Sequence, residues 1–365
     1  MQKYNQISVF LESFEGGGAE QVLLTLINSF AENGYKVEVV LSRSGGVYQK
    51  QLSSAVNLVE LRAKSLYCVL PKLVRYLKRA KPPILLTTLN LASMVVLAAK
   101  RLAQANTRVT IRVANTISLQ PKGWLKNKID RQLQRWIYPW ADAIISVSDG
   151  VGDDLAIHVG IPRERIITVY NPMITTKLKE LSMVDLKHPW FEPNQPPVIL
   201  GVGRLDVLKD FDTLIRAFGR VRMESSARLL ILGEGNQRTK LESLVAELNL
   251  CDKVSMPGFV ENPFYYMKNS HVFVLSSISE GLPGALIQAL ACGCPVVSTD
   301  CPTGPVEILQ HGKYGHLVPV GDVDALAQAI LRSLRGDHRK PPAEWLNQFR
   351  VDPVVEQYLN IMEGG

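Results

Sequence analysis

No stretch of about 18 uncharged apolar residues occurs in this 365-residue chain, so we expect no transmembrane helix. The longest apolar candidate, residues 83–99, is broken by polar side chains. The first residues also lack a signal-peptide pattern, because Glu12 and Glu15 end the apolar run and no small-residue cleavage site follows. These absences predict a cytoplasmic protein.

Cysteine and histidine are scarce as well, with five and six residues in the whole chain. Cys292, Cys294 and Cys301 cluster, but no histidine and no second thiol pair stands near them in sequence. Small buried side chains explain the cluster better than zinc or redox chemistry, which is the less favoured alternative. The chain also contains no GxSxG motif and no Walker loop, which argues against α/β-hydrolases and P-loop nucleotidases.

Positive charge is abundant but unevenly placed. Residues 1–190 carry 25 Lys and Arg against 14 Asp and Glu, whereas residues 191–365 carry 16 against 20. Between Arg62 and Arg135 there are 16 basic residues and a single acid, Asp130. The two halves of the chain are therefore expected to face different partners.

Short β-branched runs alternate with longer helical stretches along the whole chain, which is typical of βαβ units and parallel sheets. In the first half the expected strands are residues 7–11, 36–41, 84–88, 108–113, 143–147 and 166–169. In the second half they are residues 198–202, 228–232, 254–256, 272–275, 295–298 and 316–319. A proline-bearing polar stretch, residues 188–197, separates the two series.

The sequence thus predicts an α/β protein with two Rossmann-like, doubly wound domains that face a central cleft. The first domain is expected over residues 1–187 and the second over 198–340, joined by the linker 188–197. A C-terminal helical segment, 341–365, could cross back to the first domain. Ligands of such sheets bind beyond the carboxyl ends of the strands, where the turns into helices lie.

The first notable turn, Gly16-Gly17-Gly18, lies between the first strand and a helix. Without side chains there, backbone N–H groups and the start of the helix can approach an anion or a sugar closely. The turn is not the GxGxxG of dinucleotide-binding proteins, which disfavours a Rossmann oxidoreductase. A turn that is merely tight remains the alternative.

The second turn contains Gly203, Arg204 and Lys209 and follows the strand 198–202. Gly203 lets the chain turn, and the two cations leave the same connection. A guanidinium fork and a compact ammonium at the carboxyl end of a strand suit a diphosphate. Two basic residues in a loop are often only solvated, but the strand–turn–helix context favours binding.

The third turn precedes a helix that is expected to start at Pro283 and to stop at Gly293. The backbone N–H groups expected to converge at its start belong to Gly281, Leu282 and Gly284. Glu280 lies in the preceding loop, and Gln288 lies on the helical face that leads back to the turn. Both polar side chains could therefore reach one ligand.

Two DxD sequences, at residues 210–212 and 322–324, match a pattern of many metal-dependent transferases. Each stands where a helix is expected to start, and acids in a first turn are favoured by capping and by the helix dipole. We interpret them as caps and expect no bound metal.

Taken together, these residues resemble glycosyltransferase family 4, retaining enzymes of the GT-B fold. The resemblance spans nearly the whole chain and is strongest to bacterial transferases that build lipopolysaccharide core, O-antigen or capsular glycans. The segments that carry it are GGGAEQVLLTLINSF, SVSDGVGDDL, VYNP, VGRLDVLKDFDTLIRAF, LLILGEG, GFVENPF, SSISEGLPGALIQALACGCPVVSTDCPTGPVEIL and GKYGHLVPVGD.

The resemblance implies that Arg204 and Lys209 bind the donor diphosphate and stabilise the leaving nucleotide, where negative charge develops. It also implies that Glu280 binds hydroxyls of the donor sugar. The other donor contacts that it implies are Gly16, Gly17, Gly18, Gly203, Gly233, Glu234, Phe259, Val260, Gly281, Leu282, Pro283 and Gln288. The donor is then a nucleoside-diphosphate sugar, with UDP as the first candidate, and no metal or other cofactor is required.

Two positions depart from the family pattern. Members usually carry a second glutamate eight residues after the first, where this chain has Gln288. The amide keeps one acceptor for the ribose diol and loses the charge, which costs about 1 kcal/mol. Near residues 111–116 many relatives place a histidine or an acid against the acceptor, and here Ala114 and Asn115 stand there. No catalytic base is therefore named; a front-face retaining mechanism, in which the leaving phosphate takes the acceptor proton, requires none.

The basic segment 62–135 needs an explanation other than donor binding. Two of its expected helices are rich in Lys and Arg, and the second interleaves them with Trp124 and Trp136 and is followed by Trp140. Basic helices with tryptophan suit the headgroups of an anionic bilayer, and in the family the first domain binds an acceptor that is commonly lipid-linked. We hypothesise peripheral docking at the inner face of the cell membrane. A solvated face is the alternative, and nucleic acid is disfavoured because no recognition motif accompanies the charge.

The leading hypothesis is a retaining, metal-independent glycosyltransferase that moves a hexose or N-acetylhexosamine to a lipid-linked or polysaccharide precursor. Two alternatives stay open. The first is an inverting transferase or a sugar-nucleotide epimerase of the same architecture. The second is a donor-binding subunit without activity, which Gln288 and the missing base suggest.

Overall fold

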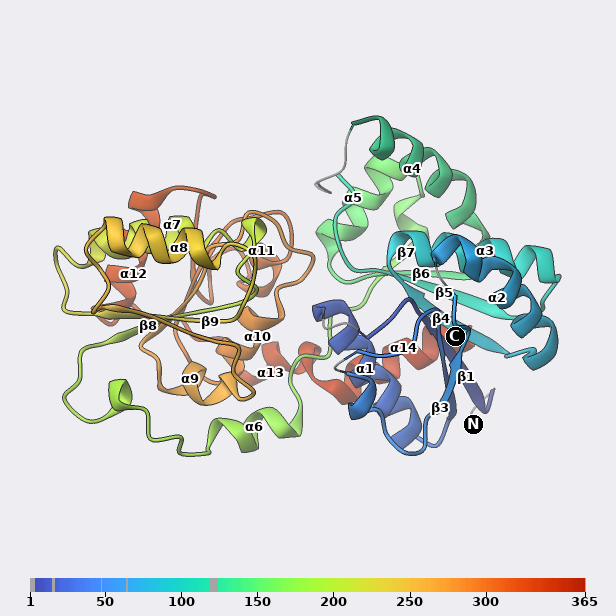
Figure 1. Ribbon diagram of the computed structural model, residues 1–365, viewed down its shortest axis with the longest axis horizontal. Coiled ribbons are helices and arrows are strands. Elements are labelled where there is room, and N and C mark those ends of the chain that lie inside the picture. The colour runs from blue at the N-terminus through green and yellow to red at the C-terminus, as the bar shows by residue number, and fades with distance from the viewer. Residues whose placement is uncertain (1–3, 15–16, 47, 64, 119–123, 365) are drawn as a thin grey trace. The chain divides into compact units, whose positions relative to one another are not determined.

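The computed structural model describes residues 4–14, 17–46, 48–63, 65–118 and 124–364 (Figure 1). The chain forms two compact units, one of residues Met1–Pro172 with Phe349–Gly365 and one of residues Met173–Gln348. Each unit is built on its own parallel sheet. Within the described residues no helix combines the length and the apolarity needed to cross a membrane.

The first unit contains a seven-stranded sheet in the order β3-β2-β1-β4-β5-β6-β7. Its strands are β1 (Gln6–Leu11), β2 (Lys36–Leu41), β3 (Asn57–Glu60), β4 (Ile84–Thr88), β5 (Arg108–Val113), β6 (Ala143–Ser146) and β7 (Ile166–Thr168). All neighbouring strands run parallel. The central strands are buried on both faces, which explains why they appear in sequence as almost continuous apolar runs.

Helices cover both faces of this sheet (Figure 1). One layer consists of α1 (Gly18–Glu32) and α14 (Val351–Glu363), which pack against each other. The other consists of α2 (Leu66–Ala80), α3 (Asn90–Ala103), α4 (Trp124–Ile137) and α5 (Asp149–Val159). Two contacts fasten α14 to this unit: Tyr35 Oη donates to Glu363 Oε1 at 2.8 Å, and Arg108 Nη2 donates to the carbonyl of Ile361 at 3.3 Å.

The second unit contains a six-stranded sheet in the order β10-β9-β8-β11-β12-β13. Its strands are β8 (Val198–Val202), β9 (Arg228–Leu232), β10 (Val254–Gly258), β11 (Val272–Leu275), β12 (Val296–Thr299) and β13 (His316–Val318). On one face lie α7 (Phe211–Val221), α8 (Arg238–Glu247) and α12 (Val323–Leu334). On the other lie α9 (Pro263–Asn269) and α10 (Gly284–Ala291), with α11 (Pro305–Ile308) beside α10 and α6 (Thr176–Ser182) against α9. A buried core of Phe218, Leu229 and Ile330 fills the first of these interfaces.

The twelve expected strands all form, with ends within one or two residues of the expected ones. Among the strands and α-helices of the described residues, β3 and α6 were not expected. The edge strand β3 is short and only partly buried, and α6 has only seven residues, so neither leaves a strong periodic pattern in the sequence. The expected last helix is interrupted between α13 (Ala343–Leu346) and α14, and a 3-10 turn, Asn347–Phe349, fills the break.

The division between the units differs from the expected linker. Residues 188–197 lie inside the second unit, because their aromatic rings pack on α9. The rings of Phe191 and Tyr265 are 5.7 Å apart, those of His188 and Tyr266 are 5.8 Å apart, and the Arg228 guanidinium lies 5.1 Å above the Trp190 ring. The prolines of this stretch suggest a free linker, whereas its aromatic residues anchor it.

The chain passes between the units at two places close to each other. It leaves the first unit after Pro172 and returns at Phe349, and the rings of Tyr170 and Phe349 are in contact at 5.2 Å. Residues 349–365 therefore belong to the first unit, while the rest of the expected C-terminal segment stays with the second.

Candidate active site

The predicted site residues of the second unit lie on loops that leave the carboxyl ends of neighbouring strands. Backbone hydrogen bonds join these loops in the order of the strands. Gly233 N donates to Gly258 O at 2.8 Å, and Gly203 N donates to Leu232 O at 3.0 Å. Ile278 N donates to Leu208 O at 2.8 Å. The sheet order therefore gathers the predicted residues from four strands, β10, β9, β8 and β11, at one edge of the sheet.

Gly203 and Gly233 directly follow β8 and β9, and a larger side chain would be excluded at each for a different reason. Gly233 has a φ of +139°, and a Cβ there would lie 1.9 Å from the carbonyl oxygen of Gly203. Only glycine fits such a close approach of two loops. At Gly203 a Cβ would instead meet the Lys209 chain at 3.3 Å. Gly203 thus makes room for the alkyl stem of Lys209.

The centre of the site is an ion pair between Lys209 and Glu280. Lys209 Nζ lies 2.5 Å from Glu280 Oε1, and the two side chains are only 21% and 13% exposed. Lys209 ends the 3-10 turn Val207–Lys209, whose cap Asp206 accepts from Lys209 N at 3.1 Å. The half-buried setting makes this contact stronger than an exposed ion pair.

Glu280 is held by its backbone as well as by its side chain. Its N–H donates to Pro302 O at 2.9 Å, and its carbonyl accepts from Thr303 N at 2.8 Å. Ser277 Oγ donates to Glu280 Oε1 at 2.6 Å. Burial, together with the charge of Glu280, raises the pKa of the neighbouring Cys301 thiol to about 12, so this cysteine stays protonated at neutral pH.

The loop between Glu280 and α10 presents backbone donors. Leu282 and Pro283 are buried, and the N–H groups of Leu282 and Gly284 donate to no protein atom within the described residues. Gly284 begins α10, and a Cβ there would lie 2.3 Å from the Met173 side chain. Backbone N–H groups at the start of a helix, together with the helix dipole, favour binding of an anion or a hydroxyl oxygen.

Four other predicted residues are more exposed or make fewer hydrogen bonds than Lys209 and Glu280. Arg204 is 71% exposed and lies 3.0 Å from Asp206. Gln288 is partly exposed, one turn into α10, and its side-chain amide has no hydrogen-bond partner among the residues that the structure describes. Phe259 follows Gly258 and is 76% exposed, and the partly exposed Val260 is next in the chain.

Glu234 is engaged by the protein itself. Its two carboxylate oxygens accept from Arg238 at 2.6 and 2.8 Å, and this guanidinium holds the pKa of Glu234 below its usual range. Its backbone carbonyl accepts from Leu205 N at 2.8 Å. Glu234 therefore joins the loops after β8 and β9, and its side chain points toward α8.

The DxD acids are helix caps, as expected. Asp210 accepts from Thr213 N at 3.3 Å at the start of α7, and Asp322 accepts from Ala325 N at 2.9 Å at the start of α12. Asp212 pairs with Arg216 at 2.6 Å. Within the described residues no group of three or more His, Cys, Asp or Glu side chains is placed to hold a metal ion.

In the first unit the glycine turn caps α1. Gly17 is the N-cap, and its N–H donates to Glu20 Oε2 at 3.2 Å. A Cβ at Gly18 would meet nothing within 4 Å, and one at Gly17 would only touch Glu20 at 3.9 Å. The described part of the fold thus gives no steric reason for glycine at either position. The third predicted glycine, Gly16, lies outside the described residues.

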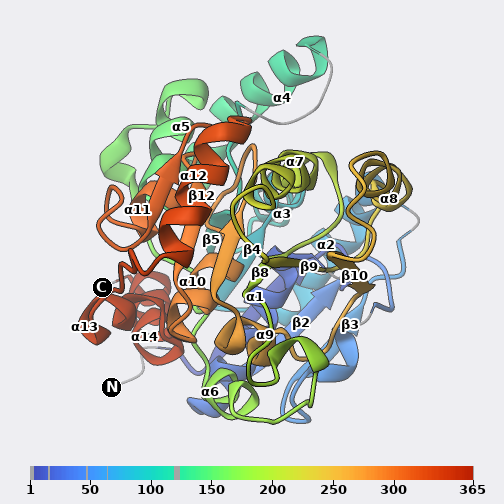
Figure 2. The same cartoon turned by 90° about the vertical axis from the view of Figure 1, so that its left-hand side faces the viewer.

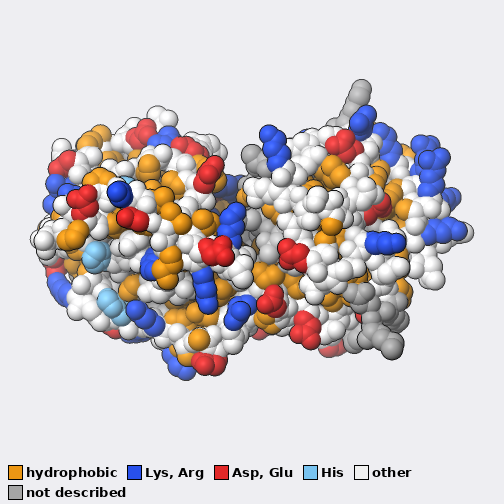
Figure 3. Space-filling view, turned by 90° about the horizontal axis from the view of Figure 1, so that it is seen from below, with side chains coloured by type: hydrophobic (Ala, Val, Ile, Leu, Met, Phe, Trp, Pro, Cys, Tyr) orange, Lys and Arg blue, Asp and Glu red, His pale blue; other side chains and the backbone are white. Residues whose placement is uncertain are grey.

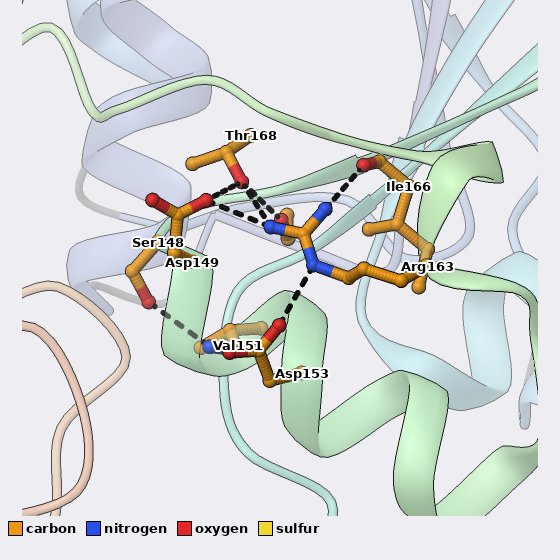
Figure 4. A network of polar contacts seen from close by, with 8 residues as sticks. Ser148, Asp149, Val151, Asp153, Arg163, Ile166 and Thr168 are labelled. Carbon is orange, nitrogen blue, oxygen red and sulfur yellow. Dashed lines mark hydrogen bonds and ion pairs between the residues drawn. The ribbon is translucent and has the colours of Figure 1, made fainter.

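The segment SVSDGVGDDL forms the start of α5 and a polar network around Arg163 (Figure 4). Ser148 caps the helix by accepting from Val151 N at 3.2 Å. The guanidinium of Arg163 donates to Asp149 at 2.7 Å, to Asp153 at 2.8 Å and to the carbonyl of Ile166 at 2.7 Å. This network ties α5 to the start of β7.

The basic residues between 62 and 135 do not form one uniform face. Several are held by the fold: Lys100 pairs with Asp142 at 2.5 Å, Lys72 donates to two carbonyls, and Arg101 lies 4.2 Å above the Trp140 ring. Arg112 is 1% exposed and donates to Thr88 and Asn171. On the face that Figure 3 shows, Lys and Arg side chains gather at the right-hand edge of the first unit.

Sequence reasoning missed the two serines before Glu280. Ser276 Oγ donates to Lys209 O at 2.8 Å, while Ser277 contacts Glu280. It also missed Met173, which lies against Gly284. The only signal for the serines is their position directly after a strand and three to four residues before Glu280.

Comparison with known proteins agrees with this architecture. Residues 16–177 match the profile described as Glycosyltransferase Family 4, and residues 185–348 match the profile described as Glycosyl transferases group 1. An uncharacterised glycosyltransferase of Methanocaldococcus jannaschii is 32% identical over 333 residues, which cover 80% of this chain and 82% of that protein. The chain belongs to glycosyltransferase family 4.

A second relative of this glycosyltransferase, from Campylobacter jejuni, is the N-acetylgalactosamine-N,N'-diacetylbacillosaminyl-diphospho-undecaprenol 4-alpha-N-acetylgalactosaminyltransferase. It is 29% identical over 357 residues, which cover 92% of this chain and 91% of that protein. Among solved structures, the lipopolysaccharide outer core galactosyltransferase WaaB is similar with a TM-score of 0.76 at 20% identity, covering 98% of both chains. Anabaena HepE in complex with UDP is similar with a TM-score of 0.79 at 18% identity, covering 97% of this chain and 98% of that one. These structures show the fold, which is GT-B.

Proposed function

We propose that this glycosyltransferase is a retaining enzyme that transfers a hexose or an N-acetylhexosamine from a UDP-sugar to a lipid-linked or lipopolysaccharide precursor. The observation that carries the proposal is the Lys209–Glu280 pair at the carboxyl edge of the second sheet, which sets a cation for phosphate beside a carboxylate for sugar hydroxyls. The relative from Campylobacter jejuni, named for its undecaprenol-linked acceptor, and the UDP complex of HepE support the acceptor and the nucleotide.

The roles of the residues follow from their charge and exposure. Lys209 and Arg204 bind the diphosphate and stabilise the charge that develops on the leaving nucleotide. Lys209 has three donors, so it can hold Glu280 and a phosphate oxygen at once. The N–H groups of Leu282 and Gly284, which donate to no atom of the described residues, bind phosphate or sugar oxygens. With two side-chain cations at the diphosphate, no metal is needed.

The experiment is a titration of the purified chain with UDP, GDP and a panel of UDP-sugars, followed by assay of nucleotide-sugar hydrolysis with and without EDTA. We expect UDP to bind more tightly than GDP, and activity to persist in EDTA. Lys209→Ala should weaken UDP binding by about tenfold or more, as expected for a lost charged contact. Asp324→Asn, which changes an exposed acid of the second DxD, is the matched control and should bind UDP as the wild type does.

One observation favours a second candidate, a donor-binding subunit without activity. Gln288 stands where family members usually carry glutamate, and its amide has no partner within the described structure. Hydrolysis of a UDP-sugar by the wild type that is lost in Glu280→Ala supports the enzyme. Binding of UDP without any turnover, with or without added lipid acceptor, supports the inactive subunit.

We further propose that the first unit docks on the anionic inner face of the cell membrane through α4. This helix lies at the periphery of the unit, packed against α3 and α5 (Figure 2). Its apolar side chains Ile129, Leu133 and Trp136 are 53%, 46% and 73% exposed, whereas the polar Gln134 is 1% exposed. The helix thus turns its apolar stripe outward, which an ordinary surface helix does not do.

Positive charge accompanies this stripe. Lys128 and Arg135 are exposed on the same helix. Farther along the same face of the sheet, Arg75, Lys78 and Arg79 are exposed on α2, which packs on α3. Anionic headgroups attract such side chains by about 1 kcal/mol each, and an inserted tryptophan adds apolar contact. The predicted Lys122 lies outside the described residues, as do the side chains of Trp124 and Lys126.

Flotation with vesicles tests this docking. We expect recovery with phosphatidylglycerol vesicles, little recovery with phosphatidylcholine vesicles, and loss of recovery on adding salt. The double variant Leu133→Ser, Trp136→Ser should float poorly, while Met223→Ser, which removes an 80% exposed apolar side chain from the second unit, should float as the wild type does. Equal recovery of the double variant and the wild type would refute docking through α4.

A further inference from the structure

Two consecutive buried serines stand where β11 ends, and each holds one member of the Lys209–Glu280 pair. Ser276, 1% exposed, donates its hydroxyl to the backbone carbonyl of Lys209 at 2.8 Å. Ser277, 0% exposed, donates its hydroxyl to Glu280 Oε1 at 2.6 Å. Neighbouring side chains on one extended segment point to opposite sides, so one serine serves the loop after β8 and the other serves Glu280.

The carboxylate of Glu280 is used asymmetrically. Oε1 accepts from both Lys209 Nζ, at 2.5 Å, and Ser277 Oγ, at 2.6 Å. Oε2 has no protein partner among the described residues. Backbone hydrogen bonds to Pro302 and Thr303 fix the main chain of Glu280. The orientation of its carboxylate therefore depends on the two side-chain donors, Lys209 and Ser277.

The two donors are not equivalent. Lys209 carries a compact charge on a flexible stem that can reach either carboxylate oxygen, and a bound diphosphate also attracts it. Ser277 sits on a rigid strand end, because its own carbonyl accepts from Thr299 Oγ1 at 2.6 Å. A short hydrogen bond to an ionised acceptor from such a fixed donor orients the carboxylate.

We propose that Ser277 is a positioning residue for donor-sugar recognition: it keeps Glu280 Oε1 turned toward Lys209 and so presents Oε2 to a hydroxyl of the donor sugar. This inference rests on the proposed function, in which Glu280 binds the sugar. The Ser277 hydroxyl itself does not contact the donor. Its removal should therefore weaken the recognition of the sugar and leave the recognition of the nucleotide unchanged.

The test compares Ser277→Ala and Ser277→Cys with the wild type in the purified full chain. Titrations with UDP, UDP-galactose and UDP-N-acetylgalactosamine measure the gain in affinity that the sugar adds to UDP, and hydrolysis of the better donor measures turnover. In Ser277→Ala we expect UDP affinity within about twofold of the wild type and a roughly tenfold lower kcat/KM for the donor. Ser277→Cys, nearly the same size with a weaker donor, should fall between the two.

Ser298→Ala is the matched control. Ser298 is 0% exposed on the adjacent strand β12, and its hydroxyl donates only to the carbonyl of Thr299 at 2.8 Å, so this variant removes a buried hydroxyl that does not touch the ion pair. It should bind UDP and the UDP-sugars as the wild type does. If Ser277→Ala also keeps the full sugar gain and full turnover, the inference is wrong.

The same measurements would also reveal whether Ser277 only supports the fold. It would lower the affinity for UDP and for the UDP-sugars by the same factor and would lower the melting temperature, which also contradicts the inference. Failure of the proposed function appears differently, as a wild type that binds none of these nucleotides. If Ser277→Ala does not fold, Ser277→Cys preserves the volume and supplies the measurement.

Discussion

At the scale of single residues, contacts made by neighbouring residues hold the charged side chains of the second unit in place. Gly203 makes room for the stem of Lys209, and Asp206 caps the short turn that Lys209 ends. Glu280 is clamped by Pro302 and Thr303. Lys209 and Glu280 are far apart in the chain and meet at 2.5 Å because β8 and β11 are neighbours in the sheet.

Gln288→Glu is the first prediction at this scale. The amide lies on the face of α10 that leads back to Gly284, and a carboxylate there accepts stronger, charge-assisted hydrogen bonds from a ribose diol. We expect UDP affinity to be unchanged or to rise by up to about fivefold, equivalent to roughly 1 kcal/mol. Isothermal titration with UDP measures it, and 2',3'-dideoxy-UDP, which lacks the diol, should show no gain.

A large loss of UDP affinity in Gln288→Glu would contradict the prediction and would show that the amide N–H₂ has a role of its own. Gln288→Ala separates the two cases. If the amide acts only as an acceptor for the diol, alanine should weaken UDP by less than about tenfold.

At the scale of elements, the structure explains segments that the sequence marks only as motifs. SVSDGVGDDL caps α5 and collects acids around Arg163 (Figure 4). Gly152 stands inside this network, since a Cβ there would lie 3.0 Å from Ser146 Oγ and 3.2 Å from Arg163 Cζ. A Cβ at the second glycine of the motif would therefore require the Arg163 guanidinium and the Ser146 hydroxyl to shift by a few tenths of an ångström.

A double-mutant cycle tests this arrangement. Arg163→Ala removes two partly exposed ion pairs and the hydrogen bonds to the Ile166 carbonyl and the Thr168 hydroxyl, and we expect it to lower the free energy of unfolding by about 1 kcal/mol. Gly152→Ala should destabilise the wild type by about 1–2 kcal/mol through overpacking and destabilise Arg163→Ala by less, because one of the two clashing groups has gone. If urea unfolding shows that the destabilisations caused by Gly152→Ala and Arg163→Ala simply add, the proposed contact between residue 152 and Arg163 is wrong.

The inward-facing Gln134 and outward-facing Trp136 show why α4 was only partly predictable. The sequence predicts a basic helix interleaved with tryptophan here, and the helix forms. The pattern does not say which face is buried. Packing against α3 and α5 turned the polar face inward, and the exposed apolar stripe is the basis of the membrane proposal.

At the scale of the whole molecule, the last helix belongs to the unit in which the chain began. Val354, Val355, Tyr358 and Met362 of α14 are buried, and α14 packs on α1, β4 and β5. The chain therefore closes the first unit only after the second is complete.

Removal of residues 349–365 should act on the first unit alone. Four buried side chains would leave exposed apolar surface on α1 and the sheet, a loss on the order of several kcal/mol. In calorimetry we expect a transition at much lower temperature for the first unit and an unchanged one for the second, with UDP affinity retained within about threefold. Glu356→Gln, which changes an exposed side chain of the same helix, is the control and should unfold as the wild type does. Loss of UDP binding on truncation would contradict the assignment of nucleotide binding to the second unit.

The sequence by itself determined the two parallel sheets and the helix caps at Asp210 and Asp322, because these depend on local patterns of apolar residues, glycines and capping acids. It also pointed to Arg204 and Lys209 through their position after a strand and to Glu280 through its position before a helix. Only the tertiary structure decided that Lys209 and Glu280 form a pair, that Ser277 donates to the carboxylate of Glu280, and that residues 188–197 pack on α9. These contacts join segments distant in the chain, and strand order and side-chain packing, which no local pattern encodes, bring them together.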